Sequence, residues 1–531
     1  MQENLLLLLS LLFATSMLSM ISNKLRISYP IFLVVSGLLI GFIPGIPLIT
    51  LQPDLVFLVF LPPLLYAAAW NTSWKDFWLY KRPIVLLAFG LVIFTSTIVA
   101  FTAHSMIPDF SLAMGFLLGG IVSPPDAIAA SSVLQELHVP KRMQTVLEGE
   151  SLINDASSLI VFRVALAAVL TGQFAFSKAG ADFFLVTAAG IFIGIAIAGI
   201  LYVVHRFLPT TPSIDAALTL ISPYIMYITA EHFHYSGVMA VVSGGLFLSF
   251  RSHEIFSYNS RIQVYSFWQT LTFLLNGLVF ILIGLQLPAI VKGLGQYSLI
   301  DAVRYGIIIS LLTIVIRIIW VYPGAYLPRV LSKGIRTRER RPSLKVVFLV
   351  GWSGMRGVVS LAAALSVPLL LSNGQLFPHR NLILFITFTV ILFTLIVQGL
   401  TLPLFIRAFK IRDEEENMEE QEPAVRLRLA MAALDHMQQQ HEDALGDVEA
   451  YNRLKERYER MIQIANNKLT NEENTMAAPG FLPRYRRMLI EIIAVKREEL
   501  NKLRHEGKYS DELLKSKEWE LDLEEARLMQ S

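Results

Sequence analysis

The chain has 531 residues, of which 54% are hydrophobic and 16% are charged, whereas soluble domains carry about 25% charged residues. It contains no cysteine, which excludes disulfides and thiol chemistry, and its net charge of +3 gives no indication of a nucleic-acid partner. Charged residues become frequent only after about Ile411. We therefore predict a membrane domain over residues 1–411 and a charged helical tail over residues 412–531.

Apolar runs define the predicted membrane helices, because about 20 apolar residues are needed to cross a bilayer. Residues 4–22 form the first run. We expect them to be retained as a helix, since no basic segment precedes them and no small-residue cleavage site follows. The runs together predict an all-α polytopic membrane protein with about thirteen transmembrane helices, centred near residues 13, 36, 60, 93, 122, 157, 192, 222, 243, 277, 314, 357 and 394.

Basic residues indicate the topology, because they concentrate in cytoplasmic loops. With the N-terminus outside, the predicted outside loops contain only Lys178, Lys292, Arg304 and Arg380. The predicted cytoplasmic loops contain Lys24, Arg26, Lys75, Lys81, Arg82, Lys141, Arg142, Arg206, Arg251, Arg261, Arg329, Lys333, Arg336, Arg338, Arg340, Arg341 and Lys345. This asymmetry predicts an outside N-terminus and a cytoplasmic tail.

Two of the predicted helices are interrupted near their centres. The fifth contains the segment Ser123-Pro124-Pro125-Asp126, and the twelfth contains a glycine-rich segment over residues 351–357. Proline removes a backbone donor, and runs of glycine loosen a helix. Interrupted helices at corresponding places in two halves are typical of transporter binding sites. We therefore predict two inverted six-helix repeats, joined by the seventh helix, with two crossing broken helices.

The sixth predicted helix carries charges at membrane depth, where each costs roughly 2.5 to 3.5 kcal/mol on insertion scales. Asp155 follows Asn154, and it lies four residues after Ser151 and three before Ser158, so these oxygen atoms share one helix face. Oxygen ligands suit hard cations. Burial favours a protonated carboxylate, whereas a bound cation favours the ionised form. The pattern predicts a site that holds a proton or a cation; the structural alternative is a carboxylate neutralised by an arginine.

Asp126 has two interpretations because it lies in the interruption of the fifth helix. Broken helices expose carbonyl groups and helix ends that bind ions, which predicts that Asp126 is an ion ligand or neutralises a half-helix N-terminus. The alternative is a simple N-cap, for which Asp is a favoured residue. Pro125 offers only its backbone carbonyl at this place.

The remaining charges of the sixth helix are given structural or supporting roles. Glu150 and Asp155 point about 140° apart at 3.6 residues per turn, so we expect Glu150 to pair elsewhere, with Arg356 of the twelfth helix as the partner. Arg163 lies further along the helix, where it supports the site, pairs elsewhere or extends toward the interface. We expect Arg317 and Glu231 to lie near helix ends, at the membrane interface.

The tail begins with the acidic run Asp413-Glu414-Glu415-Glu416. Helical spacing of apolar residues follows over residues 424–465, residues 466–483 are typical of a break, and a last helical stretch covers about residues 484–529 with an interruption near Gly507. The tail is either a solvated helical appendage or a regulatory module that binds a ligand, a partner or itself.

Four motifs resemble those of the cation/proton antiporter-1 family, the sodium/proton exchangers of bacteria and eukaryotes. The most specific is the octet from Gly149 to Ala156, Gly-Glu-Ser-Leu-Ile-Asn-Asp-Ala. The other three are Leu61-Pro62-Pro63-Leu64-Leu65-Tyr66, Ser123-Pro124-Pro125-Asp126-Ala127 and Gly354-Met355-Arg356-Gly357-Val358-Val359-Ser360-Leu361. The resemblance covers about residues 5–410 and does not extend to the tail.

The resemblance implies a homodimer in which a core around the broken helices moves like an elevator. It makes Asp155 the cation and proton carrier, with Asn154, Ser151 and Asp126 as ligands or supports, and it implies a stabilising pair of Glu150 with Arg356. In this family, an Asn at the position of Asn154 implies electroneutral exchange. The chain departs from many members at residues 67–69, where three alanines replace a third-helix carboxylate.

We therefore expect a secondary antiporter, not an enzyme, that exchanges protons for monovalent cations in the inner (plasma) membrane of a bacterium. Na⁺, bound at Asp155 and Asp126, is the first expectation, with Li⁺ or K⁺ as alternatives, and Ser158, Pro125 and Arg163 are supporting residues. No cofactor is expected. Beyond the lipid bilayer, the expected partners are a second copy of the chain and a regulatory ligand or self-association at the tail. A transporter of another solute, such as an organic anion, and a membrane sensor of pH or ions that acts through the tail are the alternatives.

Overall fold

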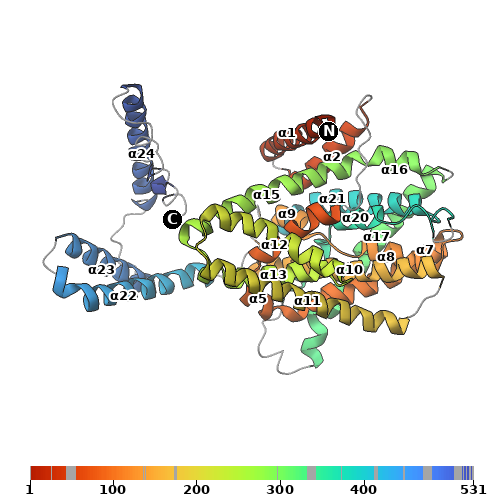
Figure 1. Cartoon of the computed structure of the whole chain (residues 1–531), viewed down its shortest axis with the longest axis horizontal. Coiled ribbons are helices and arrows are strands. Elements are labelled where there is room, and N and C mark those ends of the chain that lie inside the picture. The colour runs from red at the N-terminus through yellow and green to blue at the C-terminus, as the bar shows by residue number, and fades with distance from the viewer. Residues whose placement is uncertain are drawn as a thin grey trace. The chain divides into compact units, whose positions relative to one another are not determined.

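The structure is a computed structural model of the chain (Figure 1). It describes residues 2–25, 27–43, 56–134, 139–172, 176–295, 297–331, 342–371, 374–411, 417–445, 449–469 and 481–506, together with residue 137 and isolated positions between 517 and 528. This described part is built from helices and contains no β-strand; Leu370 and Leu376 form an isolated antiparallel bridge.

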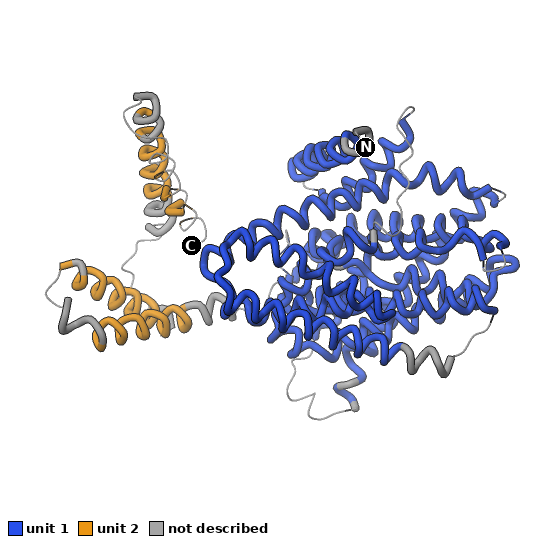
Figure 2. The backbone as a smooth tube through the Cα atoms, viewed as in Figure 1, with its two compact units in different colours: residues 1–414 blue, residues 415–531 orange. Residues whose placement is uncertain are grey.

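The chain divides into two compact units, residues 1–414 and residues 415–531 (Figure 2). The helices of the first unit are α1 Gln2–Leu25, α2 Tyr29–Gly41, η1 Val56–Phe60, α4 Leu61–Asn71, α5 Trp74–Leu79, α6 Lys81–Val85, η2 Leu86–Leu91, α7 Val92–Met106, α8 Leu112–Val122, α9 Ala127–Leu134, α10 Lys141–Thr171, α11 Phe176–Phe207, α12 Pro212–His232, α13 Gly237–Phe250, α14 Ser252–Ile255, α15 Tyr258–Leu285, α16 Leu287–Gly293, α17 Leu299–Leu331, α19 Leu344–Trp352, α20 Val358–Leu365 and α21 Arg380–Phe409.

Eight of the described helical spans are long and apolar enough to cross a membrane: residues 6–25, 81–106, 141–171, 183–207, 212–232, 258–293, 299–327 and 380–409. Four shorter apolar helical spans cover residues 29–41, 57–71, 112–122 and 237–250. Twelve of the predicted centres fall within these helices or those given above, and the centre at residue 357 falls at the start of α20. The first unit is therefore an all-helical polytopic membrane protein.

Both predicted interruptions are present. The helix that precedes each interruption begins with a serine N-cap. Ser111 caps the N-terminus of α8, where its hydroxyl accepts a hydrogen bond from Met114 N at 3.2 Å. Ser343 caps α19 in the same way, accepting from Val346 N at 3.3 Å. The first helix then stops before the segment with two prolines and the second stops before the glycine-rich segment, because neither sequence supports a continuous backbone ladder.

The helices of the first unit pack mainly within two groups. In one group, α2 packs on α15, and α13 packs on α4, α11 and α12. In the other group, α8 packs on α7 and α10, while α17 packs on α19 and α21, and α21 also packs on α20. The two broken helices, α8–α9 and α19–α20, both begin in the second group, which therefore carries the interruptions.

Glycine permits the closest helix contacts in both groups, as is typical of membrane helices. A Cβ atom on Gly284 of α15 would lie 2.2 Å from the Val34 carbonyl oxygen and 2.6 Å from Leu38 N, both backbone atoms of α2. A Cβ atom on Gly119 of α8 would lie 2.5 Å from the Ser96 carbonyl oxygen of α7. Any larger residue at these places must push two backbones apart.

The second unit consists of α22 Asn417–Leu445, α23 Glu449–Leu469 and α24 Phe481–Glu506. The predicted helical stretch over residues 424–465 is thus two helices, which pack on each other. The hydroxyl of Tyr451 donates to the Met437 carbonyl at 3.2 Å, and both side chains are buried. The acidic run from Asp413 to Glu416, most of the predicted break and the predicted interruption at Gly507 lie outside the residues that the structure describes.

The contact at Gly284 leads to a stability prediction. Gly284→Leu should destabilise the protein by about 3 kcal/mol, the upper end of the usual cost of overpacking, because the clash is with backbone atoms that no rotamer change can move. The melting temperature in detergent, read by the loss of monodisperse protein on size exclusion, should fall by several degrees.

Gly199→Leu in α11 is the matched control, because a Cβ atom on Gly199 would meet no atom of a neighbouring helix within 4 Å. Its melting temperature should stay within about one degree of the parent value, as expected for a neutral surface change. Equal melting temperatures for the two variants would contradict this account of the contact between α2 and α15.

Candidate functional site

The two interruptions meet each other through backbone and side-chain hydrogen bonds. The backbone N–H of Asp126, in the first interruption, donates to the carbonyl of Met355, in the second, at 2.6 Å. The guanidinium Nε of Arg356 donates in the other direction, to the Val122 carbonyl at the end of α8, at 3.0 Å. The broken helices are therefore joined where they pass, in agreement with the predicted crossing.

Asp126 lies at the N-terminal ends of two half-helices. Its Oδ1 accepts a hydrogen bond from Ile128 N at 2.8 Å, which caps α9. A Cβ atom on Gly357, the residue before α20, would lie 1.8 Å from Asp126 Oδ2. Only glycine therefore allows the start of α20 to approach this carboxylate. Since helix N-termini carry partial positive charge, one carboxylate here stabilises both ends.

Two arginines lie at the opposite, C-terminal ends of the half-helices. Arg356 donates to the carbonyls of Val122, at the end of α8, and of Gly354. Arg317, from the middle of α17, donates through Nε to the Val350 carbonyl near the end of α19, at 3.3 Å. Cationic groups at helix C-termini satisfy free carbonyls and complement their partial negative charge.

Glu150 pairs with Arg317 and not with the predicted partner Arg356. Arg317 Nη1 lies 2.5 Å from Glu150 Oε1, and Arg317 Nη2 lies 2.7 Å from Glu150 Oε2. The two side chains therefore form a fully buried, bidentate ion pair. The angle between Glu150 and Asp155 on α10 correctly predicted that Glu150 points away from Asp155. It did not show which helix packs against Glu150. Arg317 was also misplaced at the membrane interface, because α17 extends from Leu299 to Leu331 and buries this residue at its centre.

Glycine again makes this arrangement possible. A Cβ atom on Gly354 would lie 2.3 Å from Arg317 Cδ and 3.1 Å from Arg356 Nη1. Gly354 therefore lets two buried guanidinium groups approach the same stretch of backbone. Their mutual repulsion is relieved by Glu150 and by the carbonyls that they hold.

Arg163 lies away from the interruptions. Its Nη2 donates to both carboxylate oxygens of Glu231, at 2.8 Å each, and both side chains are partly exposed. Glu231 is the penultimate residue of α12, in agreement with its predicted position near a helix end. Of the roles considered for Arg163, the structure therefore shows pairing elsewhere.

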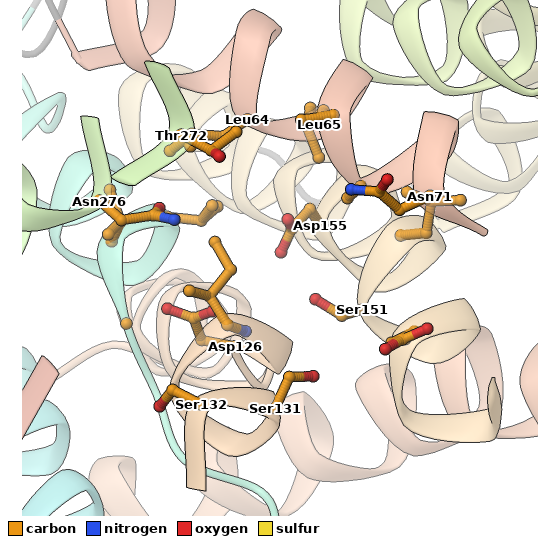
Figure 3. Close-up of a pocket in the computed structure, with 18 of the residues that line it drawn as sticks. Leu64, Leu65, Asn71, Asp126, Ser131, Ser132, Ser151, Asp155, Thr272 and Asn276 are labelled. Carbon is orange, nitrogen blue, oxygen red and sulfur yellow. The ribbon is translucent and has the colours of Figure 1, made fainter. Parts of the chain in front are cut away.

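A cavity of about 580 Å³ reaches the point where the two interrupted helices cross. Residues of α4, α9, α10, α15 and α20 line it. Figure 3 shows the carboxylates of Asp155 and Asp126 and the hydroxyl of Ser151 directed into it. Asp155 is only 8% exposed. Among the described residues, no hydrogen-bond donor or counter-charge contacts its carboxylate. Asp155 is therefore a nearly buried carboxyl group that water or an ion reaches from this cavity.

Two other predicted residues, Asn154 and Ser158, lie behind this surface. Asn154 Nδ2 donates to the Pro125 carbonyl at 3.3 Å, so Asn154 holds the first interruption against α10. The Ser158 hydroxyl donates to the backbone carbonyl of Asp155 at 3.0 Å and lies among the buried residues, outside the set that lines the cavity. The predicted stripe of oxygen atoms is thus shorter than expected, with Ser151 and Asp155 facing the cavity.

Several polar residues that line the cavity were not predicted as site residues from the sequence. Asn276 interrupts the apolar run of α15, and its buried Oδ1 has no hydrogen-bond partner among the described residues. Glu148 lies three residues before Ser151 and seven before Asp155, a spacing that places all three on one face, and it accepts from Gln144 Nε2 at 2.9 Å. Asn71 and Thr272 are further lining residues (Figure 3).

The alanines that replace a third-helix carboxylate also face this space. Ala67 and Ala68 of α4 line the cavity. The carboxylates that reach it are therefore those of Asp126, Asp155 and, nearer the start of α10, Glu148. No group of three His, Cys, Asp or Glu side chains suited to a resident metal is found in the part of the chain that the structure describes.

The family profile described as "Sodium/hydrogen exchanger, transmembrane" matches residues 8–408, about three quarters of the chain. The chain belongs to this sodium/hydrogen exchanger family. The members are secondary transporters and not enzymes, so the expected antiporter class is confirmed. The match ends where the charged tail begins.

Curated relatives agree with this assignment. The chain is 34% identical over 390 residues to a protein of Bacillus pumilus named "Sodium, potassium, lithium and rubidium/H(+) antiporter", a match that covers 71% of this chain and only 57% of that relative. It is 30% identical over 529 residues to an uncharacterized Na(+)/H(+) exchanger of Mycobacterium bovis, covering 96% and 94% of the two chains. The second match therefore includes the tail.

A solved structure shares the fold. The sodium proton antiporter MjNhaP1 from Methanocaldococcus jannaschii superposes with a TM-score of 0.60 at 21% identity, covering 75% of this chain and 99% of that one. At this identity, the likeness establishes the helical architecture of this sodium/hydrogen exchanger.

The corrected ion pair leads to a stability prediction for the exchanger. Arg317→Met should destabilise it by about 3–5 kcal/mol, because Glu150 would remain as an uncompensated charge in the interior. In a double-mutant cycle with Glu150→Gln, measured from melting temperatures in detergent, Arg317→Met should show a larger coupling energy than Arg356→Met.

Arg163→Met is the matched control, since its pair with Glu231 is partly exposed and should contribute about 1 kcal/mol or less. A larger coupling energy of Glu150 with Arg356 than with Arg317 would show that the pairing is the one first predicted from the sequence.

Proposed function

We propose that this exchanger couples the movement of one proton to that of one monovalent cation in the opposite direction, with Asp155 as the carrier of both. The observation that carries the proposal is the carboxylate of Asp155 at the end of a cavity, without a protein partner among the described residues. Asp126 and Ser151 supply further oxygen atoms to the same cavity. Oxygen ligands of this kind suit Na⁺, Li⁺ and K⁺, the transported substrates.

The charges around the crossing support exchange of one charge for one charge. At the crossing itself, apart from Glu148 near the start of α10, the core contains three carboxylates, Glu150, Asp126 and Asp155, and two guanidinium groups, Arg317 and Arg356. Together they have a net charge of about −1 when all are ionised. One proton or one monovalent cation on Asp155 neutralises the cluster, whereas two would overcharge it. Asn154 adds no second titrating group beside Asp155.

The lining of the cavity supports a state that is open to the cytoplasm. Asn71 and Thr72 end α4, Gln144 and Glu148 are near the start of α10, and Tyr265 is near the start of α15. These ends adjoin the loops that the positive-inside rule assigns to the cytoplasm. On the same basis, we assign the N-terminus to the outside and the tail to the cytoplasm. The bacterial relatives support the plasma membrane of a bacterium as the location.

Alternating access by an elevator movement is supported by the division of the helices into two groups. The cavity is lined by α9, α10 and α20, which carry the crossing and its charges, and by α4 and α15 of the other group. Asp155 thus lies at the boundary between the groups, where sliding of one past the other would change its exposure. Thirteen membrane crossings, two inverted repeats and a homodimer complete the proposed architecture, and the last rests on the family resemblance.

Na⁺ is the proposed cation, with K⁺ and Li⁺ as competitors at the same site. The names of the relatives include all three, and the printed name of the Bacillus pumilus protein adds rubidium. Transport of an organic anion is disfavoured, because carboxylates and not the two buried arginines line the cavity.

Asp155→Asn should abolish cation-dependent proton movement in proteoliposomes, by a factor of about 100 or more, because an amide neither releases a proton nor supplies an anionic ligand. A pH-sensitive dye inside the vesicles measures the exchange on addition of Na⁺, Li⁺ or K⁺. Folding should be unaffected, since the variant removes a buried charge without leaving a partner unpaired.

Asp301→Asn is the matched control: the same chemical change at an exposed position in the first turn of α17. It should transport at the parent rate. Exchange that survives in Asp155→Asn, or is lost equally in both variants, would refute the assignment of the carrier.

The stoichiometry leads to a separate prediction. Exchange in Na⁺ medium should proceed at the same rate when the vesicle membrane is clamped at zero potential, with equal K⁺ on both sides and valinomycin, as when a potential of about 100 mV is imposed. If each exchange cycle moved a net charge across the membrane, a potential of this size would change its free energy by about 2.3 kcal/mol per charge, and the rate would change with it. A rate that follows the imposed potential would contradict electroneutral exchange.

A further inference from the structure

Helix α10 takes part in two ion pairs that differ in burial and in the helices that they join. Glu150 pairs with Arg317 of α17, and both side chains are fully buried. Arg163 pairs with Glu231 of α12, and these side chains are 46% and 28% exposed. Helices α10 and α17 belong to the group that carries the broken helices, whereas α12 packs on α13 in the other group. The partly exposed pair therefore bridges the boundary between the two groups.

The Arg163 pair and the ion cavity lie on opposite sides of Asp155 along α10. The α10 residues that line the cavity extend no further than the carrier, and they are Gln144, Glu148, Ser151, Leu152 and Asp155. Arg163 is eight residues beyond Asp155, or about 12 Å further along the helix axis. Asp155 is thus reached from the cavity on one side, and an ion pair holds the two groups of helices together on the other.

The Arg163 pair can separate without leaving a buried charge alone. Glu231 Oε1 also accepts a hydrogen bond from Gly237 N, the first residue of α13, at 3.2 Å. The N-terminus of α13 therefore remains a partner for this carboxylate when Arg163 departs. The Arg163 side chain is already about half exposed, so water can hydrate it after separation. The buried pair of Glu150 with Arg317 has no such alternative, and its separation would be costly.

We propose that Arg163 and Glu231 form a latch between the two groups, which stabilises the state in which Asp155 faces the present cavity and opens when Asp155 gains access to the other side of the membrane. The proposal rests on the alternating access proposed above. Exchange without a leak requires that Asp155 is never open to both sides at once, so contacts on the closed side must separate in the opposite state. A partly exposed pair suits this role, because it biases the equilibrium by about fivefold at most and does not trap one state.

A reversible cross-link tests whether the pair must separate during transport. The chain has no cysteine, so the double variant Arg163→Cys, Glu231→Cys carries two thiols and no others. These thiols are joined by a bifunctional methanethiosulfonate with a spacer about as long as the ion pair. Cation/proton exchange in proteoliposomes should then fall by about tenfold or more, because the linked protein cannot leave its present state. Reduction of the link should restore the rate measured before cross-linking.

The double variant Lys141→Cys, Asp76→Cys is the matched control. Lys141 is at the other end of α10, and its Nζ lies 3.1 Å from Asp76 Oδ2 in a second partly exposed ion pair. Asp76 is on α5, which packs on α6 and α10. The control link therefore joins elements of one group, and exchange should continue at the rate measured before cross-linking. Exchange that also continues in the linked Arg163→Cys, Glu231→Cys protein would overturn the proposal.

Hydrogen exchange of the full chain in detergent, measured by mass spectrometry, tests the latch without transport. Arg163→Gln should shift the population toward the opposite state by up to about fivefold, as expected for the loss of a partly exposed ion pair. Amide exchange should therefore rise at the start of α13. It should fall in residues 64–71 of α4, which face the present cavity and become covered when the cavity closes. Arg163→Lys keeps the charge and should show a pattern close to that of the parent.

The two segments distinguish a latch from a purely local contact. Faster hydrogen exchange confined to the start of α13, with residues 64–71 unchanged, would show that the pair only stabilises its surroundings, and it would overturn the proposal. Identical patterns in the parent and Arg163→Gln would overturn it as well. A parent protein without cation/proton exchange would instead refute the proposed function, and the hydrogen-exchange measurement would still decide whether the latch exists.

Discussion

Breaking two helices inside a membrane creates four helix ends in a place where water cannot satisfy them, and the rest of the core depends on how these ends are stabilised. An unsatisfied backbone group in hydrocarbon costs several kcal/mol. The exchanger places the carboxylate of Asp126 at the N-terminal ends and the guanidinium groups of Arg356 and Arg317 at the C-terminal ends. The charges at the crossing are therefore first of all structural.

Each structural charge imposes a further requirement on its neighbours. Two guanidinium groups near one stretch of backbone need a counter-ion, and the buried carboxylate of Glu150 supplies it through Arg317. Close approach of these groups to the backbone needs glycine at positions 354 and 357, where a Cβ atom would overlap Arg317 and Asp126 respectively. The motifs around the interruptions thus have one physical origin. Charged side chains stabilise the helix ends, and glycines leave room for these side chains beside the backbone.

The sequence allowed a prediction of the interruptions, the polytopic helical class and the charged segment of α10 that reaches the cavity, because prolines, glycines and charges in apolar runs are local signals. The partner of Glu150 could not be predicted in this way. A helical angle shows which face a side chain occupies, but it does not show which distant helix packs against that face. Arg317 carried a usable signal, as an arginine at the centre of a long apolar run, and so did Asn276. Ser158 does not line the cavity, and its hydroxyl donates to the backbone carbonyl of Asp155 in its own helix.

Permanent compensation of four charges has a consequence for coupling under the proposed mechanism. Asp126, Arg356, Arg317 and Glu150 have helix-end or ion-pair partners within the protein, so the proposed mechanism assigns the change of charge to Asp155. With an empty site, the core would carry about one uncompensated negative charge, and moving it through the low-dielectric part of the membrane would be costly. A proton or a cation on Asp155 removes that cost equally. Movement of the loaded core and retention of the empty one then follow from the same charge balance, and this difference is what makes transport an exchange and not a leak.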